Sequence, residues 1–361
     1  MQIEQARHVV LHGQAQGEAP APWLQPEVER SWRRCLSMGL EPDQPVAFDS
    51  VTAAAMRQAT EENRNLLRAA APVVRSLSRA MLHSQYFALL TDAQGVVIDV
   101  QGPVDRSNHH VAAIARVGVD LSERAVGTTA IGTTLSDLAP VWLHRGEHFF
   151  RDTSIFSCAG APIWGPDGRC VGMLDLTGVN VQEQPALKHL VTQSARSIEN
   201  ALTLATPHSL LLRLNWPTRV LGDDNDGLVC MDEDGMITGM NRPATELLGR
   251  LQLPAKIHCT EVFAISPGQL FDDARQHKGP QELPLWSGLR LQVLAQQHER
   301  HARSTLSSSA PAVPLRDVET ALIRKAVDDA RGNVMDAARA LGISRATVYR
   351  KLGRKKPGSG A

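Results

Sequence analysis

The 361-residue sequence lacks the features of several special classes of protein. It has no uninterrupted apolar run of about 18 residues, the length at which a transmembrane helix is expected. The first residues lack the basic and apolar regions of a secretory signal, so we expect a cytoplasmic protein without a membrane segment. Cysteine is scarce: the five cysteines are scattered and form no C-x-x-C pair. This excludes a disulfide scaffold and a zinc module, and it indicates a reducing compartment.

Recognisable catalytic and metal-binding patterns are also missing. Ser154 and Ser157 lie in no G-x-S-x-G elbow, so hydrolase chemistry has no support. His144 and His148 are four residues apart and would share a helix face as metal ligands, but no third ligand is evident and ordinary surface or core histidines are the alternative. We therefore expect no enzyme activity, no metal and no cofactor.

The net charge is zero, but the charges are unevenly distributed. Between Arg316 and Lys356 there are eleven basic and five acidic residues, so the rest of the chain is acidic on balance. A basic end on an acidic body suggests contact with a polyanion, and a solvated charged tail is the alternative.

A short pattern of an apolar run, an Asp/Gly turn and a second apolar run occurs three times, at 88–98, 161–174 and 228–237. Glycine supplies the positive φ that such turns need, so each copy predicts an antiparallel hairpin. Hairpins beside helical segments predict an α+β fold class.

Helical patterns and breaks suggest the domain boundaries. Residues 1–80 are expected to be helical, with a break at Pro42 and Pro45 and an interruption near Pro72. Further helices are expected at 185–204 and, with Gly249 as the C-terminal cap, at 241–249. The expected parts are an N-terminal helical region at 1–74, a sensor domain at 75–205, a smaller α+β unit at 216–295, a flexible linker at 296–314 and an all-α domain at 315–356.

The all-α domain contains the pattern of a DNA-reading unit. Gly332 ends its first helix, Asn333 caps the second, Gly342 makes a tight turn and Ser344 caps the third. Small and apolar residues give each helix an inner face, with Ala338 at a point of close approach. The outer face of the third helix is basic, with no acidic residue from Ser344 to Lys356.

These features predict that the third helix enters the major groove. Arg345 is suited to a guanine edge, whereas Lys351 and Arg354 are expected to contact phosphates. A three-helix cap with solvated basic faces is the alternative. The expected DNA-binding residues are Asn333, Ser344, Arg345, Thr347, Arg350, Lys351 and Arg354.

With ALI at 321–323 and GNVMDAARALGISRATVYRKL at 332–352, this segment resembles the Fis-type helix-turn-helix of bacterial enhancer-binding regulators. The resemblance covers nearly the whole unit and implies binding to double-stranded DNA as a homodimer.

A second resemblance covers about 20–205. The strings SWRRC at 31–35, ERAVGTTAIGTTL at 123–135, EHFF at 147–150 and SCAGAPI at 157–163 resemble the GAF region of sigma-54 activators of the acetoin-catabolism-regulator family. This implies a GAF-like sensor for a small-molecule effector. The smaller unit is similar to a PAS domain through DEDG at 232–235 and NRPA at 241–244.

The sequence departs from that family between sensor and reader. The family's activators carry an AAA+ ATPase there, which needs a G-x-x-x-x-G-K-[ST] phosphate loop. Neither that string nor the Gly-Ala-Phe-Thr-Gly-Ala contact for sigma-54 occurs in this sequence. We therefore expect no ATP hydrolysis and no contact with sigma-54.

The candidate effector-binding residues are Trp142, Phe156 and Cys158. Aromatic residues make up only 4% of the chain, and several of them concentrate in the GAF-like segment. They would line a cavity there or fill the core. Cys158 would be redox-sensitive or a buried structural thiol. The overall expectation is an effector-responsive DNA-binding regulator, and the alternative is an adaptor that forms mixed oligomers with a full-length relative.

Overall fold

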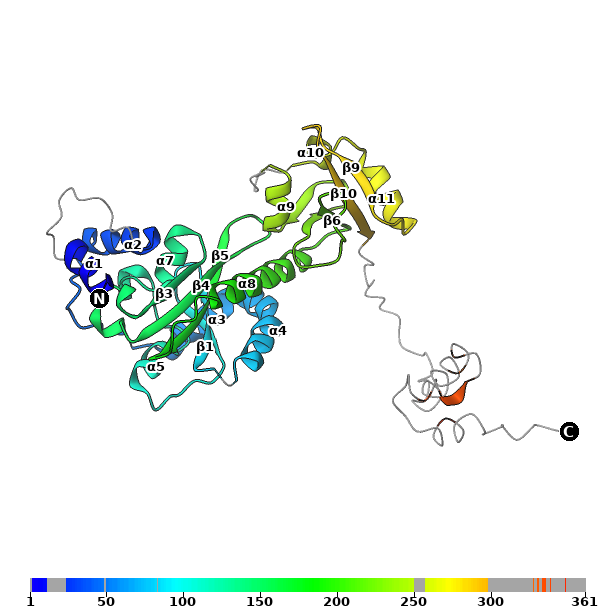
Figure 1. Cartoon of the computed structure of the whole chain (residues 1–361). Helices are drawn as coiled ribbons and strands as arrows, with labels where there is room; N and C mark the ends of the chain where they lie inside the picture. The colour runs from blue at the N-terminus through cyan, green and yellow to red at the C-terminus, as the bar shows by residue number, and fades with distance from the viewer. Residues whose placement is uncertain are drawn as a thin grey trace. The chain divides into compact units, whose positions relative to one another are not determined.

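A computed structural model describes residues 2–11, 24–48, 50–82, 84–249 and 257–297, and single residues between 327 and 348 (Figure 1). The chain divides into two compact units, Met1–Arg300 and His301–Ala361. The first unit contains two five-stranded antiparallel sheets with helices on their faces, which confirms the α+β expectation. In the described residues, every helix is too short or too polar to cross a lipid bilayer.

The first sheet has the strand order β2-β1-β5-β4-β3. Two of the predicted hairpins form its body, because β1 pairs with β2 and β4 pairs with β5 in antiparallel registers. The glycine of each turn has positive φ, as at Gly95 (φ 90°) and Gly168 (φ 77°). The strands are β1 (Tyr86–Asp92), β2 (Val97–Gln101), β3 (Val141–His144), β4 (Phe156–Trp164) and β5 (Cys170–Val179).

Both faces of this sheet are covered. Successive side chains point to opposite faces of a strand, so Leu89 packs into one hydrophobic cluster and Leu90 into the other. The first cluster includes α1 (Gln2–Leu11), α2 (Pro26–Ser37), α5 (His109–Ile114), α6 (Glu123–Val126) and α7 (Ala130–Asp137). The second includes α3 (Ala53–Glu62), α4 (Arg64–Ala80) and α8 (Leu187–Leu204). The N-terminal helices therefore belong to the core of this α+β fold.

The expected interruption near Pro72 is wrong. Pro72 lies inside α4, which is continuous from Arg64 to Ala80. A helix-internal proline costs one backbone hydrogen bond, but α4 buries an apolar face against the sheet and runs beside α8 (Figure 1). The break at Pro42 and Pro45 is confirmed, since α2 ends at Ser37 and α3 begins at Ala53.

The second sheet has the order β8-β7-β6-β10-β9 and contains the third predicted hairpin, β7–β8. The sequence pattern predicted that this unit starts at residue 216. The central strand of the sheet, β6, lies before that residue, so the unit starts earlier. Every residue of β6 is at least half-buried, so it shows no clear polar alternation. The elements are β6 (Leu210–Asn215), β7 (Gly227–Met231), β8 (Ile237–Met240), α9 (Arg242–Leu247), α10 (Cys259–Val262), α11 (Pro267–Arg275), β9 (Gln281–Pro284) and β10 (Arg290–Gln297).

Candidate functional site

A small, partly open cavity of about 30 Å³ lies between the first sheet and the helices α5, α6 and α7. Most of its wall is apolar. On one side are Leu89 and Phe156 of the sheet, and on the other are Ile114, Val126 and Ile131 of the three helices. A cavity of this size has room for about one or two water molecules, so binding of a larger ligand requires the helices to move outward.

Five polar side chains line the cavity, and three of them form one connected group: the full set is Thr129, His148, Thr153, Cys158 and Thr177. His148 follows the 3₁₀ turn Arg145–Glu147, Cys158 lies on β4 and Thr177 lies opposite Cys158 on β5. The Cys158 Sγ atom is 3.7 Å from His148 Nε2 and 3.4 Å from Thr177 Oγ1. Burial raises the pKa of the Cys158 thiol well above its ordinary value and lowers the pKa of His148 to about 4. Both side chains are therefore neutral at neutral pH.

A buried carboxyl group stands behind this wall. The Thr177 hydroxyl donates to Asp175 Oδ2, while Asp175 Oδ1 has no hydrogen-bond partner in the described part of the chain. Thr134 Oγ1 on α7 is also buried without a partner among the described residues. Burial raises the pKa of Asp175 to about 7, because a carboxylate loses its hydration there.

Helix α2 is tied to the helices over the cavity by a cluster of charged side chains, which we call the Arg34 cluster: Arg34, Glu123 and Asp137. Arg34 Nε and Nη2 donate to the two carboxylate oxygens of Glu123 at 2.7 and 2.9 Å, and Nη1 donates to Asp137 Oδ1 at 2.8 Å. The Ser31 hydroxyl on α2 also donates to Glu123, and its oxygen lies 2.8 Å from Thr128 Oγ1. A motion of α6 or α7 is thereby linked to α2.

Close packing explains the small residues of the 123–135 segment. A Cβ atom at Gly132 would lie 2.7 Å from the backbone nitrogen of Glu123. Gly127 has φ 65°, and a Cβ atom there would lie 2.8 Å from the Phe150 ring. Across the interface on β4, a Cβ atom at Gly160 would lie 2.7 Å from Thr134 Oγ1. The glycines allow α6, α7 and the sheet to approach each other closely.

The predicted effector residues separate into two groups. Phe156 and Cys158 line the cavity, and Cys158 is a buried thiol. Trp142 lies on the opposite face of the sheet, in the cluster with α4 and α8, because neighbouring residues of β3 alternate in direction. Trp142 is therefore excluded from the cavity wall. Thr177 and Leu89 were missed, since their strands are buried on both faces and carry no distinctive motif.

The histidine pair weighed as metal ligands does not share a helix face. His144 ends β3, and its Nδ1 lies 2.7 Å from Ser157 Oγ. His148 points to the cavity after an intervening 3₁₀ turn. Within the described ranges, no group of three or more His, Cys, Asp and Glu side chains is placed to hold a metal ion.

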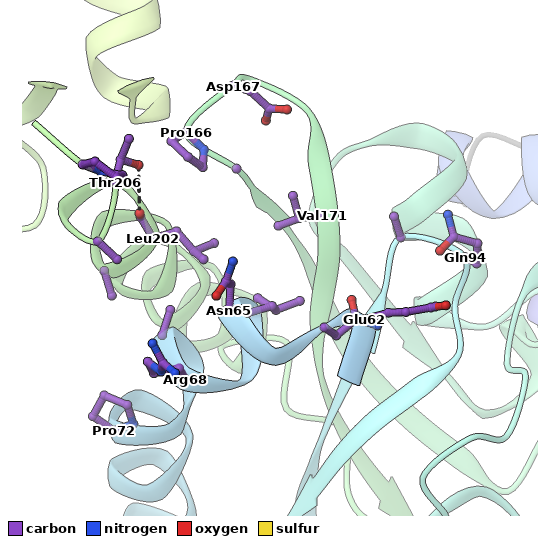
Figure 2. A pocket seen from close by; sticks show the side chains of 18 residues that line it. Glu62, Asn65, Arg68, Pro72, Gln94, Pro166, Asp167, Val171, Leu202 and Thr206 are labelled. Carbon is purple, nitrogen blue, oxygen red and sulfur yellow. Dashed lines mark hydrogen bonds between the residues drawn. The ribbon is translucent and has the colours of Figure 1, made fainter. Parts of the chain in front are cut away.

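A larger, open groove of about 840 Å³ lies on the other side of the molecule, between α4, the end of α8 and the β4–β5 turn (Figure 2). Figure 2 shows Asn65 and Arg68 on α4, with Pro166 and Asp167 on the turn. The Pro166 carbonyl oxygen accepts from the backbone N–H of Met240 at 2.9 Å. The groove is thus beside the junction of the two sheets.

Asn241 holds that junction together. Its Oδ1 accepts from the backbone N–H groups of Leu228 and Ala244 at 2.8 and 3.0 Å. Its Nδ2 donates to Asn200 Oδ1 on α8 and to the Asp226 carbonyl oxygen, both at 2.8 Å. Helix α8 therefore packs against the first sheet through apolar side chains and is hydrogen-bonded to the second α+β unit.

Of the seven predicted DNA-binding residues, Asn333 is the one that lies among the described residues. Asn333 Oδ1 accepts from the backbone N–H of Met335 at 3.0 Å, which is the capping bond predicted for it. Val334, Ala338 and Val348 pack together with Val327, so the second and third predicted helices contribute to one core. Six predicted DNA-binding residues lie outside the described residues: Ser344, Arg345, Thr347, Arg350, Lys351 and Arg354.

Comparison with known families matches both ends of the chain. Residues 314–354 match the model of bacterial regulatory protein, Fis family, which confirms the Fis-type resemblance. Residues 4–200 match the model of MimR, N-terminal domain, and so cover more than half of the chain. The protein belongs to the MimR N-terminal domain family.

The curated relatives include transcription regulators. The chain is 29% identical to the acetoin catabolism regulatory protein of Cupriavidus necator, over 61% of this chain and 34% of the relative. It is 30% identical to the propane 2-monooxygenase operon transcriptional activator MimR of Mycolicibacterium smegmatis, over 50% of this chain and 31% of the relative. The chain thus matches about a third of the length of these relatives, and the resemblance to the acetoin-catabolism-regulator family is confirmed.

Among solved structures, the chain is similar to the E. coli DhaR(N)-DhaL complex. The TM-score is 0.47 and the identity 15%, over 76% of this chain and 100% of that chain. That score is too low to establish a common fold.

Proposed function

We propose that this protein is a DNA-binding transcription regulator that senses a small-molecule effector through the cavity between the first sheet and helices α5–α7. The observation that carries the proposal is the combination of a Fis-family segment with this cavity in one chain. The first α+β unit acts as a GAF-like sensor and the second as a PAS-like unit. The protein works in the cytoplasm, where its DNA is found.

Its DNA-binding end is expected to act as a homodimer on two half-sites. Arg345 reads a guanine edge, and Lys351 and Arg354 neutralise phosphates. The basic composition of this segment and the Fis-family match support these roles.

We propose further that regulation proceeds without ATP hydrolysis and without contact with sigma-54. The segment between the two family matches, 201–313, contains no phosphate-loop string. Instead, this segment holds the second sheet, which is joined to α8 through Asn241. In this proposal, effector binding alters the contact between α8 and the second sheet, and this change alters how much of the DNA is bound.

DNA binding is tested by fluorescence anisotropy with DNA from upstream of the protein's own operon. Wild type is expected to bind, Arg345→Ala to lose sequence preference, and Lys351→Ala to weaken binding to all sequences while lowering the salt slope. Lys278→Ala, at an exposed position after α11, is the control and should bind like wild type. No binding by wild type, or equal binding by Arg345→Ala, would overturn the proposal.

An adaptor function is the second candidate. It is favoured by the observation that the chain matches about a third of the relatives' length. Such an adaptor would form mixed oligomers with a full-length relative and bind no specific site. Co-purification with the relative, together with absence of specific DNA binding in the same anisotropy experiment, would favour it.

A further inference from the structure

The hydrogen bonds around His148 show which of its ring nitrogens donates and which accepts. His148 Nδ1 lies 2.9 Å from the backbone carbonyl oxygen of Arg145. A carbonyl oxygen only accepts, so Nδ1 carries the ring proton. Burial keeps the ring neutral by lowering the pKa of His148 to about 4. Nε2 is consequently an acceptor at the cavity.

Thr177 supplies a second acceptor. Its hydroxyl donates to Asp175 Oδ2 behind the wall. Because Asp175 Oδ2 accepts this hydrogen bond, the Thr177 proton points to Asp175 and not into the cavity. The remaining lone pairs of Thr177 Oγ1 are directed to the side of Cys158, 3.4 Å from its sulfur.

Cys158 has one weak donor proton for these two acceptors. Burial keeps this side chain as the thiol. One of the two acceptors therefore lacks a hydrogen-bond donor. Thr153 does not supply it, because its hydroxyl donates to the Phe150 carbonyl oxygen at 3.0 Å. Thr129, the N-cap of α7, also lines the cavity: its Oγ1 accepts from the backbone N–H of Gly132, and its hydroxyl group retains one donor proton.

We infer that the cavity selects small neutral aliphatic alcohols over ketones of the same carbon skeleton. The alcohol hydroxyl donates its proton to the acceptor pair of His148 and Thr177, and the alkyl body packs against the apolar wall around Leu89. A ketone has no proton to donate and leaves an acceptor unpaired. The inference rests on the proposed effector function of the cavity.

The ligand also has to displace helices. The cavity of about 30 Å³ is smaller than a four-carbon alcohol needs, so binding moves α5, α6 or α7 away from the sheet. Glu123 on α6 and Asp137 at the end of α7 are held by Arg34. An alcohol in the cavity therefore acts on the Arg34 cluster and on α2.

Calorimetric titration of the full chain with matched pairs tests the selectivity. The pairs are 2-propanol with acetone, 2-butanol with 2-butanone, and cyclohexanol with cyclohexanone. The alcohol should bind with a Kd at least about tenfold lower than its ketone. Equal or tighter ketone binding would overturn the alcohol preference alone, and would assign the contact to Thr129. Absence of binding by all six compounds would overturn the effector function of the cavity as well.

Two variants identify the acceptors. His148→Leu and Thr177→Val each remove one acceptor, so the alcohol-to-ketone affinity ratio should fall toward one in at least one of them. Thr177→Val is isosteric and remains informative if His148→Leu does not fold. Trp142→Phe, on the opposite face of the sheet, is the control and should keep the wild-type ratio. An unchanged ratio in both acceptor variants would overturn the assignment.

Discussion

Arg34 and Glu123 are 89 residues apart in the sequence and form a two-pronged ion pair at 2.7 and 2.9 Å. The Glu123 side chain is only 8% exposed, and that of Arg34 is 33% exposed. This pair joins α2 to α6, a helix whose Val126 lines the cavity. It also explains why the SWRRC and ERAVG segments belong to one folded unit.

Loss of this pair should destabilise the fold. Arg34→Ala leaves a buried Glu123 carboxylate without its strongest partner, so we expect a loss of about 2–3 kcal/mol in the free energy of unfolding. The neighbouring Arg33→Ala is the control, because the 60% exposed Arg33 side chain pairs with Glu29 one turn away on α2. Its effect should stay within about 0.5 kcal/mol. Urea unfolding measures both variants, and equal effects would contradict the account.

A second prediction concerns the stability of variants at the glycines of the α6–α7 contact. Gly132→Ala places a Cβ atom 2.7–2.8 Å from the backbone of Glu123, so α7 must shift at a cost of about 1–3 kcal/mol. Gly268→Ala in α11 meets no atom within 4 Å and should stabilise its helix by about 0.5–1 kcal/mol. The two variants should change the thermal midpoint in opposite directions. A stabilising Gly132→Ala would disprove the close packing.

Asp175 predicts a pH dependence of stability. Burial raises its pKa to about 7 in the folded protein, above the unfolded value of roughly 4. The folded state therefore binds the proton more tightly, and stability declines as the pH rises from about 4 to about 7. His148, with its pKa lowered to about 4, acts in the opposite direction below about 6.5. The comparison with Asp175→Asn isolates the Asp175 contribution.

In that comparison, Asp175→Asn keeps an acceptor for Thr177 but does not ionise. Its stability relative to wild type should increase from pH 4 to pH 7, as measured by urea unfolding at each pH. A constant difference across this range would show that Asp175 titrates normally.

A fourth prediction concerns the contribution of Asn241, at the junction of the two sheets, to the stability of the fold. Asn241→Ala removes four hydrogen bonds and leaves buried backbone N–H groups without acceptors. We expect a loss of about 2–4 kcal/mol in the free energy of unfolding. Asn65→Ala, on the exposed side of α4, is the control and should be neutral or slightly stabilising. Similar stability of both variants would contradict the role of Asn241.

Local signals made much of the fold predictable. The three hairpins were found because Asp/Gly turns and flanking apolar runs lie within a dozen residues of each other. The cap at Asn333 was also predictable, since it depends on one side chain and the next turn of helix. Gly249 has φ 80°, as its place at a helix end predicts.

Long-range relationships were not predictable in the same way. Strand β3 is buried at Val141, Trp142 and Leu143, so its sequence does not reveal which face meets the cavity. The placement of Trp142 away from the cavity follows only from the pairing of β3 with β4. Similarly, the partner of Arg34 is set by the packing of α2 on α6, which no local pattern encodes.

The most direct test of the account measures DNA binding of the full chain by fluorescence anisotropy while 2-butanol is added, without ATP. The account predicts specific binding whose apparent Kd changes with the alcohol in wild type, with little change in at least one of His148→Leu and Thr177→Val. A full response to the alcohol in both variants, an apparent Kd for DNA that does not change with the alcohol in wild type, or a requirement for ATP would contradict it.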